Sequence, residues 1–271
     1  MKILAISDLH SFYKETVKAL EESGHLDDPD SVVLVNGDVL DRGDEPFELI
    51  DYLIDLLRQG RLIYVKGNHE ALLDEALDDI AKGFPIEVLG ASRHVHNGTV
   101  DTILKLAGMN ADEAVMFPKE LVERVRNSRF YKELLPAAVN YYETDNYIFT
   151  HGWIPCIIEG YGNERTYRYN KQWRDASKLH WRIASTLNGM KMAVEYGITE
   201  PGKTVVCGHF HTSYGHANIS RICSEYGDDA IYTPFYADGI IAIDACTADS
   251  GKVNCVVIED TVTEKNIGMD G

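Results

Sequence analysis

The sequence predicts an α/β fold, and three observations support that prediction. Apolar runs of strand length recur along the chain, helix-like stretches alternate with the first four or five of them, and 45% of the 271 residues are hydrophobic. This apolar content is spread over the whole length, so it can form a large buried core and excludes wholesale disorder. Because α/β folds of this length often form one body, we expect a single domain over residues 1–271.

Seven segments are predicted to be strands, because their continuous apolar character suits strands covered on both faces. They are Lys2–Ile6, Ser31–Asn36, Leu62–Lys66, Tyr147–Thr150, Thr204–Cys207, Ile240–Asp244 and Val253–Ile258. Two stretches between the first strands, Tyr13–Ser23 and Pro46–Gln59, carry apolar residues at helical spacing. Strand and helix therefore alternate at the start of the chain, as they do in α/β proteins.

The interval of residues 71–141 has a different pattern, which predicts a helical insertion or cap within the domain. Ala71–Lys82 and Lys119–Glu133 have helical patterns, whereas Ala91–Thr99 is rich in turn residues. A second stretch, Gly160–Gly202, is polar and aromatic and is expected to form a long excursion over one face. No internal repeat or Pro/Ser-rich linker favours a split into two domains.

Net charge and cysteine content disfavour several classes of partner. The formal charge of −17 repels polyanions, so nucleic acid as a bulk polyanion and an anionic membrane surface are both disfavoured. The five cysteines form no CxxC pair, and we expect reduced thiols in a cytoplasmic protein. The apolar start, MKILAI, is too short for a signal peptide, and no segment is apolar over the length of a transmembrane helix.

Polar residues that can bind metal follow five of the predicted strands directly. In chain order they are Asp8, His10, Asp38, Asn68, His151, His209 and His211. In an open α/β sheet the loops at the carboxyl ends of the strands converge, so these side chains are expected to meet in one place. Glycines stand beside these residues, where a positive φ or a close backbone approach would exclude a β-carbon: Gly37, Gly43, Gly67, Gly152 and Gly208.

These seven side chains predict a site for two divalent metal ions. Carboxylate oxygen, imidazole nitrogen and amide oxygen suit divalent first-row metals, and the absence of cysteine argues against a structural zinc finger. Seven ligands exceed the need of one ion, whereas a pair about 3.5–4 Å apart, bridged by one carboxylate and a water, would use them all. Mn²⁺ is the default expectation, and Fe, Zn or Co would accept the same ligands.

Five motifs in this order resemble the calcineurin-like metallophosphoesterase superfamily. They are DLH at 8–10, GDVLDRG at 37–43, GNHE at 67–70, HG at 151–152 and GHFH at 208–211. The complete GDxxDRG and GNHE blocks are similar to its phosphoprotein-phosphatase-like (Ser/Thr phosphatase) branch, and residues 97–104 and 239–260 resemble bacterial members. The resemblance covers the chain nearly end to end and implies a four-layer αββα sandwich.

The resemblance also implies a role for each motif residue. It assigns one metal to Asp8, His10, Asp38 and His211, and the other to Asp38, Asn68, His151 and His209, with Asp38 bridging. Arg42 would grip the phosphoryl oxygens, because its planar fork of donors suits phosphate. His69, oriented by Asp41, would protonate the leaving group, while a bridging water acidified by the two cations attacks phosphorus as hydroxide.

Some positions depart from the pattern of this branch. Trp153 replaces a glycine that is typical of eukaryotic relatives and is expected to reshape one wall of the site. A second phosphate-binding arginine is expected in Gly160–Gly202, where Arg182 fits an LWxR pattern imperfectly and Arg174 fits it less well. The two histidines of GHFH resemble the broader superfamily, since the protein phosphatases often have one, so the assignment of His211 follows the superfamily and not this branch.

Several polar residues near the motifs are interpreted as structural. Glu70 is expected to cap the helix that follows GNH, with its charge at the helix dipole rather than on a metal. His94 and His96 lie in the turn-rich segment and are expected to be exposed or structural rather than ligands.

The sequence therefore predicts a metal-dependent phosphoric ester hydrolase acting on phosphomonoesters, with phosphoserine or phosphothreonine in proteins as a candidate substrate. A dinucleoside polyphosphate or another diester is the alternative, because the same kind of centre serves relatives with those substrates. The third hypothesis is a non-catalytic, metal-stabilised binding protein. It is disfavoured because Arg42, His69 and every expected ligand are present.

Overall fold

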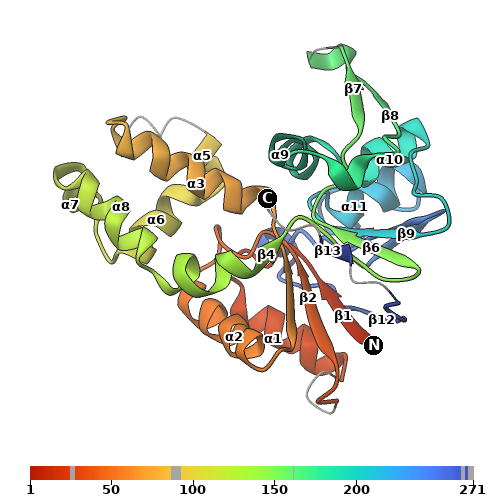
Figure 1. The fold of residues 1–271 in the computed structure, drawn as a ribbon, viewed down its shortest axis with the longest axis horizontal. Helices are drawn as coiled ribbons and strands as arrows, with labels where there is room; N and C mark the ends of the chain where they lie inside the picture. Colours follow the sequence, from red (N-terminus) through yellow and green to blue (C-terminus); the bar gives the residue numbers. More distant parts are fainter. Residues whose placement is uncertain (25–27, 87–92, 161, 264–265, 268–271) are drawn as a thin grey trace.

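Two β-sheets pack face to face in this protein, and helices cover both outer sides (Figure 1). The structure is a computed structural model that describes residues 1–24, 28–86, 93–160, 162–263 and 266–267. The layers follow the order helix, sheet, sheet, helix, so the predicted α/β class and the αββα sandwich are confirmed.

The first sheet is built mainly from the N-terminal third of the chain. Its strands lie in the order β12, β1, β2, β3, β4, with bounds Val256–Glu259, Lys2–Ile6, Val32–Asn36, Leu62–Val65 and Ala138–Val139. Strands β1 to β4 pair in parallel, and β12 runs antiparallel to β1. The predicted strands of this sheet therefore form, although β12 begins at Val256 and not at Val253.

The second sheet comes from the rest of the chain. Its order is β10, β11, β9, β6, β5, β13, with bounds Phe235–Ala237, Ile240–Ala242, Thr204–Cys207, Tyr147–Thr150, Tyr142–Glu143 and Asn266–Ile267. Strands β6, β9 and β11 pair in parallel, whereas β5, β10 and β13 pair antiparallel to their neighbours.

Both faces of each sheet are buried, which explains the unbroken apolar runs of the sequence. In β1, Leu4 and Ile6 belong to the core beneath the outer helices, while Ile3 and Ala5 join the core between the two sheets. Successive strand residues point to opposite faces, so a strand covered on both sides must be apolar at every position.

The helices follow the strands in three groups. Helices α1 and α2, Tyr13–Glu22 and Pro46–Arg58, cover the outer face of the first sheet. Helices α9 (Lys178–Leu187) and α10 (Met190–Tyr196) lie on the outer side of the second sheet. Two short helices follow, α11 (Thr212–Tyr214) and α12 (Thr247–Ser250). The third group is α3, α5, α6, α7 and α8, with bounds Asn68–Ala81, Arg93–His96, Thr99–Ala107, Ala111–Met116 and Pro118–Arg126.

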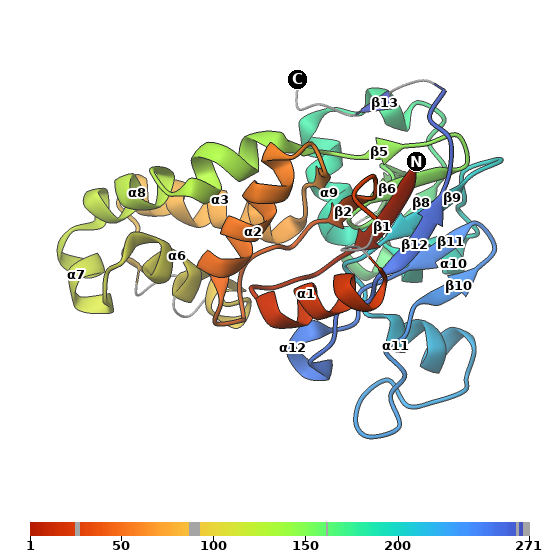
Figure 2. The same cartoon turned by 90° about the horizontal axis from the view of Figure 1, so that it is seen from below.

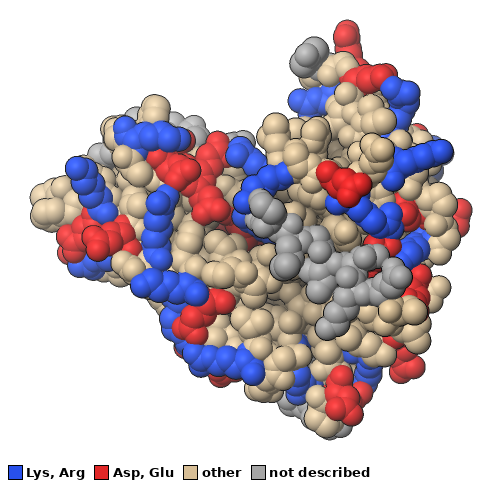
Figure 3. All heavy atoms as spheres, in the orientation of Figure 1, with Lys and Arg blue, Asp and Glu red and all other residues tan. Residues whose placement is uncertain are grey.

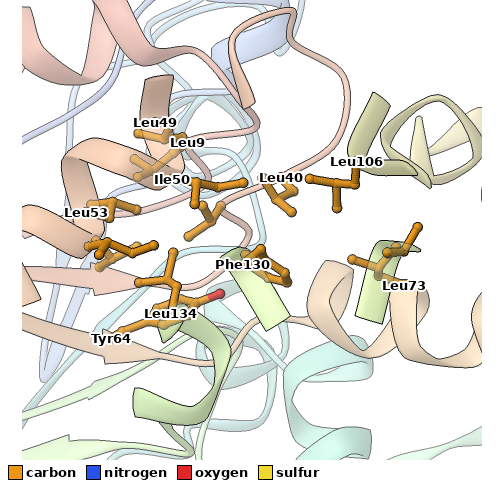
Figure 4. Close-up of a cluster of buried hydrophobic side chains, with 14 of the residues drawn as sticks. Leu9, Leu40, Leu49, Ile50, Leu53, Tyr64, Leu73, Leu106, Phe130 and Leu134 are labelled. Atoms are coloured by element: carbon orange, nitrogen blue, oxygen red, sulfur yellow. The ribbon is translucent and has the colours of Figure 1, made fainter. Parts of the chain in front are cut away.

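This third group occupies the segment predicted as a helical insertion, and it extends away from the sheets (Figures 1 and 2). Its core is continuous with the core beneath the first sheet, because one cluster of buried side chains joins Leu53 of α2 and Tyr64 of β3 to Leu73, Leu106 and Phe130 (Figure 4). The turn-rich prediction for Ala91–Thr99 is wrong in part: residues 93–96 form α5 and α6 begins at Thr99, while residues 91–92 lie outside the described part.

The predicted excursion begins with a two-stranded hairpin, β7 and β8 (Ile157–Glu159 and Thr166–Arg168), which projects from the body in Figure 1. Among the described residues, no helix is long and apolar enough to cross a membrane.

Candidate metal centre

The predicted ligands come from loops at the carboxyl ends of strands in both sheets. Asp8, Asp38 and Asn68 follow β1, β2 and β3 of the first sheet, and His151 and His209 follow β6 and β9 of the second. Backbone hydrogen bonds join these loops: the Asp8 N–H donates to the Gly37 carbonyl at 3.1 Å, and the Gly208 N–H donates to the His151 carbonyl at 2.8 Å. Two further bonds cross between the sheets, from His151 Nδ1 to the Asn36 carbonyl at 2.7 Å and from the His209 N–H to Asp8 Oδ2 at 3.0 Å, so the predicted ligands lie along one line where the sheets meet.

Asp38 lies at the centre of this line. It shares one compact group of potential ligand atoms with His10 and His69, and a second with His151 and His209. Within each group the atoms lie within 4.8 Å of one another, and the Asp38 side chain is buried. A carboxylate common to two donor groups is what a bridging ligand requires. Asn68 extends the second group, because its Oδ1 lies 2.7 Å from His151 Nε2.

Each of three histidines is fixed by a backbone carbonyl. His10 Nδ1 donates to the Leu40 carbonyl at 3.0 Å, and His151 Nδ1 donates to the Asn36 carbonyl at 2.7 Å. His209 uses its Nε2 in the same way, toward the Thr186 carbonyl at 3.0 Å. Since a carbonyl oxygen can only accept, the other nitrogen of each ring is left with its lone pair in the neutral form. This arrangement is typical of metal-binding histidines.

Burial and charge divide the protonation states of these rings. Burial lowers the pKa of His209 to about 3, and burial together with Arg42 holds the pKa of His10 well below its usual value. Burial also acts to lower the pKa of His151, but the charge of Asp38 outweighs it and raises that pKa to about 10. Two rings are therefore neutral donors at pH 7, and a cation must displace a proton from the third.

Asp8 and His211 are predicted ligands that lie outside these two groups. The Asp8 carboxylate accepts from the His209 N–H at 3.0 Å and from Ser7 Oγ, and burial raises its pKa to about 6. His211 Nδ1 lies 2.7 Å from Ser213 Oγ, and its Nε2 lies 3.2 Å from the Tyr226 hydroxyl. The His211 imidazole is therefore oriented toward the loop that carries Tyr226.

The predicted catalytic residues lie against the first donor group. Arg42 Nη1 is 2.9 Å from His10 Nε2, and Arg42 Nη2 is 3.4 Å from His69 Nε2. His69 Nδ1 donates to Asp41 Oδ2 at 2.6 Å, which leaves Nε2 as the nitrogen that faces Arg42 and Asp38. An arginine fork, an oriented imidazole and a shared carboxylate are thus brought together.

The backbone around these residues is strained. Asp8, His10, Asp38, Arg42 and His209 all have positive φ, between 48° and 66°. Residues with a β-carbon adopt this region at a cost, and such strain clusters at functional sites. The flanking glycines allow the close approach, since a β-carbon at Gly37 would lie 2.5 Å from Gly67 Cα and one at Gly67 would lie 2.1 Å from Asp38 Oδ1.

Glu70 has a larger role than the predicted helix cap. It does cap α3, because its Oε2 accepts from the Gly67 N–H at 2.7 Å. Its carboxylate also accepts from the Asp38 N–H at 3.2 Å and from the Val39 N–H at 3.0 Å. The same side chain therefore braces the loop that carries Asp38.

Two residues at the site were missed by the sequence analysis. Thr99 Oγ1 donates to Asp41 Oδ2 at 2.9 Å, and Asp244, which follows β11, is buried near Asp8. Burial, reinforced by the charge of Asp8, raises the pKa of Asp244 to about 8. Asp244 is the last residue of the predicted strand Ile240–Asp244, close to where the predicted ligands follow other strands, so its position could have found it. Thr99 carried no signal of its own beyond its place in the block at residues 97–104.

Three further predictions concern the walls of the site. Trp153 is fully buried in the core of the second sheet. Its indole packs against other core side chains and lines no wall of the site, so that expectation is wrong. Arg174 binds Glu143 and Glu200 through close ion pairs. Arg182 is half-exposed on α9, where its Nη2 lies 3.3 Å from Glu75 of α3.

A cavity of about 740 Å³ lies between α3 and α9 and is lined by Gly67, Lys66, Lys178 and Arg182 among others. A smaller one of about 220 Å³ shares Arg182 and is lined by Asn68. The molecular surface is hollowed between the helical segment and the α9 side, with charged side chains on both walls (Figure 3).

The donor set fits two first-row divalent cations. It combines a buried, shared carboxylate with imidazoles that each have one nitrogen hydrogen-bonded to a backbone carbonyl, and it includes no thiolate. Comparison with known proteins agrees. A family model described as calcineurin-like phosphoesterase matches residues 1–233.

Two sequence relatives and one solved structure are similar to the chain. "Shewanella-like protein phosphatase 2" of Arabidopsis thaliana is 32% identical over 82 residues, which are 26% of this chain and 21% of that one. The asymmetrical bis(5'-nucleosyl)-tetraphosphatase PrpE of Bacillus subtilis (strain 168) is 25% identical over 133 residues, 46% of this chain and 50% of that one. A cold-active protein tyrosine phosphatase structure shares the fold, with a TM-score of 0.53 at 13% identity, over 95% of this chain and 73% of that one. The matched regions thus span half or less of the two sequence relatives.

Proposed function

The chain belongs to the calcineurin-like phosphoesterase family, and on that basis we propose that it is a dinuclear metal-dependent phosphoesterase that hydrolyses phosphomonoesters. The observation that supports this most is the position of Asp38, shared by two groups of donors, with the Arg42 guanidinium against His10 and His69. Cation-binding groups and a phosphate-binding group are needed together for this reaction, and here they lie side by side.

We assign the first metal to Asp8, His10, Asp38 and His211 and the second to Asp38, Asn68, His151 and His209. Two bound divalent cations, with Mn²⁺ as the default, would activate water as the nucleophile and offset charge on the phosphoryl oxygens. The four-residue sets are supported by the two donor groups around Asp38, which hold four of the seven side chains.

The chain's own side chains supply the remaining steps. Arg42 donates two N–H bonds to the phosphoryl oxygens and orients the group for in-line displacement. His69, with its Nδ1 proton held by Asp41, presents Nε2 toward the same place and can deliver a proton to the departing alkoxide. Burial acts to lower the pKa of His69, but Asp38 and Asp41 outweigh it and raise that pKa above its usual value.

A phosphoserine or phosphothreonine peptide is the substrate class that we favour. The part of a substrate beyond the phosphoryl group would lie in the cavities beside α9, the smaller of which is lined by Asn68 and Arg182. A dinucleoside polyphosphate is the second candidate, because PrpE is similar over part of its length. The larger cavity holds Lys66, Lys178 and Arg182, but it is also lined by the carboxylates Asp74, Glu75, Asp78 and Asp79.

The test is a side-by-side kinetic panel on the Mn²⁺-loaded protein: an aryl phosphate, phosphopeptides, diadenosine tetraphosphate and a bis-aryl phosphate diester. We expect the monoesters to be turned over fastest and chelator to abolish turnover. Asp38→Asn and His151→Ala should each lower kcat by at least about 1,000-fold, because they remove cation-binding groups worth several kcal/mol at the transition state.

Asp238→Asn, at an exposed carboxylate away from the pocket, is the matched control and should keep full activity. Turnover that survives Asp38→Asn would refute the assigned centre. A marked preference for diadenosine tetraphosphate over every monoester would leave the centre in place but replace the substrate class.

A further inference from the structure

We propose that Thr99 is a positioning residue, which holds Asp41, and through it His69, in the orientation needed at the leaving group. The proposal rests on the hydrolytic function proposed above and adds to it a residue that lies outside the five motifs. It is carried by three contacts between helix α6 and the Asp41–Gly43 turn.

The first contact is a short chain of buried hydrogen bonds. Thr99 Oγ1 donates to Asp41 Oδ2 at 2.9 Å, and His69 Nδ1 donates to the same oxygen at 2.6 Å. The three side chains are 0%, 2% and 3% exposed, so water does not compete for these bonds. Two donors on one carboxylate oxygen fix the plane of the carboxylate, and the carboxylate in turn fixes the imidazole.

The second and third contacts come from the same helix. A β-carbon at Gly98, whose φ is +82°, would lie 2.6 Å from the Arg42 backbone nitrogen, so the glycine permits α6 to rest directly on that residue. Lys105 Nζ donates to the Gly43 carbonyl at 3.2 Å. Helix α6 therefore touches three consecutive residues of the DRG turn.

The turn needs such support, because two of its residues are held away from their preferred backbone conformation. Asp41 and Arg42 have φ values of +79° and +64°. Strained residues keep their geometry only where the surroundings over-determine it. Without the Thr99 hydroxyl, Asp41 loses one of the two buried donors seen among the described residues, and His69 Nε2 is no longer held at one position relative to Arg42.

The test compares two substrates whose leaving groups differ in how much they need a proton. For a phosphoserine peptide, whose alkoxide must be protonated, Thr99→Val should lower kcat by roughly 10–100-fold with little change in KM, part of the roughly 100- to 10,000-fold that a general acid contributes. For p-nitrophenyl phosphate, whose leaving group departs without a proton, the loss should stay below about 3-fold. Thr99→Ser, which keeps the hydroxyl, should restore both rates.

A second readout does not depend on activity. In the protein as isolated, the Nδ1 proton of His69 should give a far-downfield ¹H resonance, identified by its loss in His69→Gln. The resonance should move upfield or broaden in Thr99→Val and persist in Thr99→Ser. Thr102→Val, at another buried threonine of α6, is the matched control and should alter neither the resonance nor the rates.

Equal rate losses on both substrates, or an unmoved resonance, would overturn the proposal. If Thr99→Val does not fold, Thr99→Ala is judged by the same two criteria. Failure of the proposed function is a different result: the wild type would then hydrolyse neither ester, while the resonance would still report whether Thr99 orients Asp41 and His69.

Discussion

At the scale of single residues, geometry distinguishes side chains that look alike in the sequence. Arg42, Arg174 and Arg182 were all considered as phosphate ligands, but their partners differ. Arg174 is bound by Glu143 and Glu200, whereas the Arg42 fork faces the Nε2 atoms of His10 and His69. Among the described residues no carboxylate forms an ion pair with Arg42, so its guanidinium is the best placed of the three to bind an anion.

The first prediction tests the fork of Arg42. Arg42→Lys should lower kcat/KM for an aryl phosphate by about 10–100-fold, because lysine keeps the charge but cannot make the bidentate contact, which is worth about 1.5–3 kcal/mol. Steady-state kinetics at saturating Mn²⁺ measures the change. Arg168→Lys on the exposed β7–β8 hairpin is the control and should have no effect; a loss below 3-fold at Arg42 would contradict its assigned role.

The second prediction concerns Gly37, where space and backbone conformation both matter. Its φ is +83°, and a β-carbon would lie 2.5 Å from Gly67 Cα and 2.7 Å from His151 Nδ1. We expect Gly37→Ala to destabilise the protein by about 3 kcal/mol or more and to reduce bound metal, since strain at positive φ adds to a backbone clash. Gly60→Ala, with φ +69° but nothing within 4 Å, separates the two effects and should cost only about 1–2 kcal/mol.

Urea denaturation gives the two free energies, and elemental analysis gives the metal content. Equal destabilisation by the two substitutions would show that the close approach at Gly37 contributes nothing.

At the scale of elements, the edge of the second sheet is tied to the excursion after β7 and β8 by buried charge. Glu143 of β5 is 3% exposed and accepts from Arg174 and from Lys203, which precedes β9. Burial acts to raise the pKa of Glu143, but these two cations outweigh it and hold the pKa below its usual value of 4.5.

The third prediction follows from the sign of that shift. Because the folded-state pKa is lowered, the stabilisation is fully present above the unfolded pKa near 4.5 and is lost as pH falls through the folded value. Glu143→Gln should therefore destabilise the protein by about 2–3 kcal/mol at pH 7. This is less than the cost of breaking a fully buried ion pair, because Arg174 and Lys203 are partly exposed to water. The gap from wild type should shrink below about pH 4.5.

Denaturant titrations of the wild type and of Glu143→Gln at pH 7, 5 and 4 test this. The control is Glu159→Gln, which removes a carboxylate from the exposed pair with Arg168 and should change the free energy of unfolding by less than about 1 kcal/mol. A gap that is constant with pH would mean that the Glu143 charge does not stabilise the fold.

At the scale of the whole molecule, the candidate centre bridges the two sheets. Loops after β1, β2 and β3 belong to one sheet, and loops after β6 and β9 belong to the other. Ligands from both would be held by the same pair of cations, so metal binding would stabilise the packing of one sheet on the other.

The fourth prediction is a metal-dependent rise in thermal stability. At a free Mn²⁺ concentration 100 times the Kd, binding to the folded state alone contributes about 2.7 kcal/mol. The Tm should then rise by roughly 5–10 °C over the chelator-treated protein, as measured by scanning calorimetry. Asp38→Asn should lose this rise, and an undiminished rise in that variant would place the metal elsewhere.

The sequence by itself determined the fold class, the main strands and the set of candidate ligands. Unbroken apolar runs of this length are typical of strands buried on both faces, and residues directly after parallel strands lie at the carboxyl end of a sheet. The tertiary structure decided what depends on contacts between distant segments. It buried Trp153, bound Arg174 to Glu143, turned His211 toward Tyr226, and brought Thr99 of the helical segment to Asp41. No local pattern encodes these pairings, because each partner is chosen by the packing of the two sheets and the helices around them.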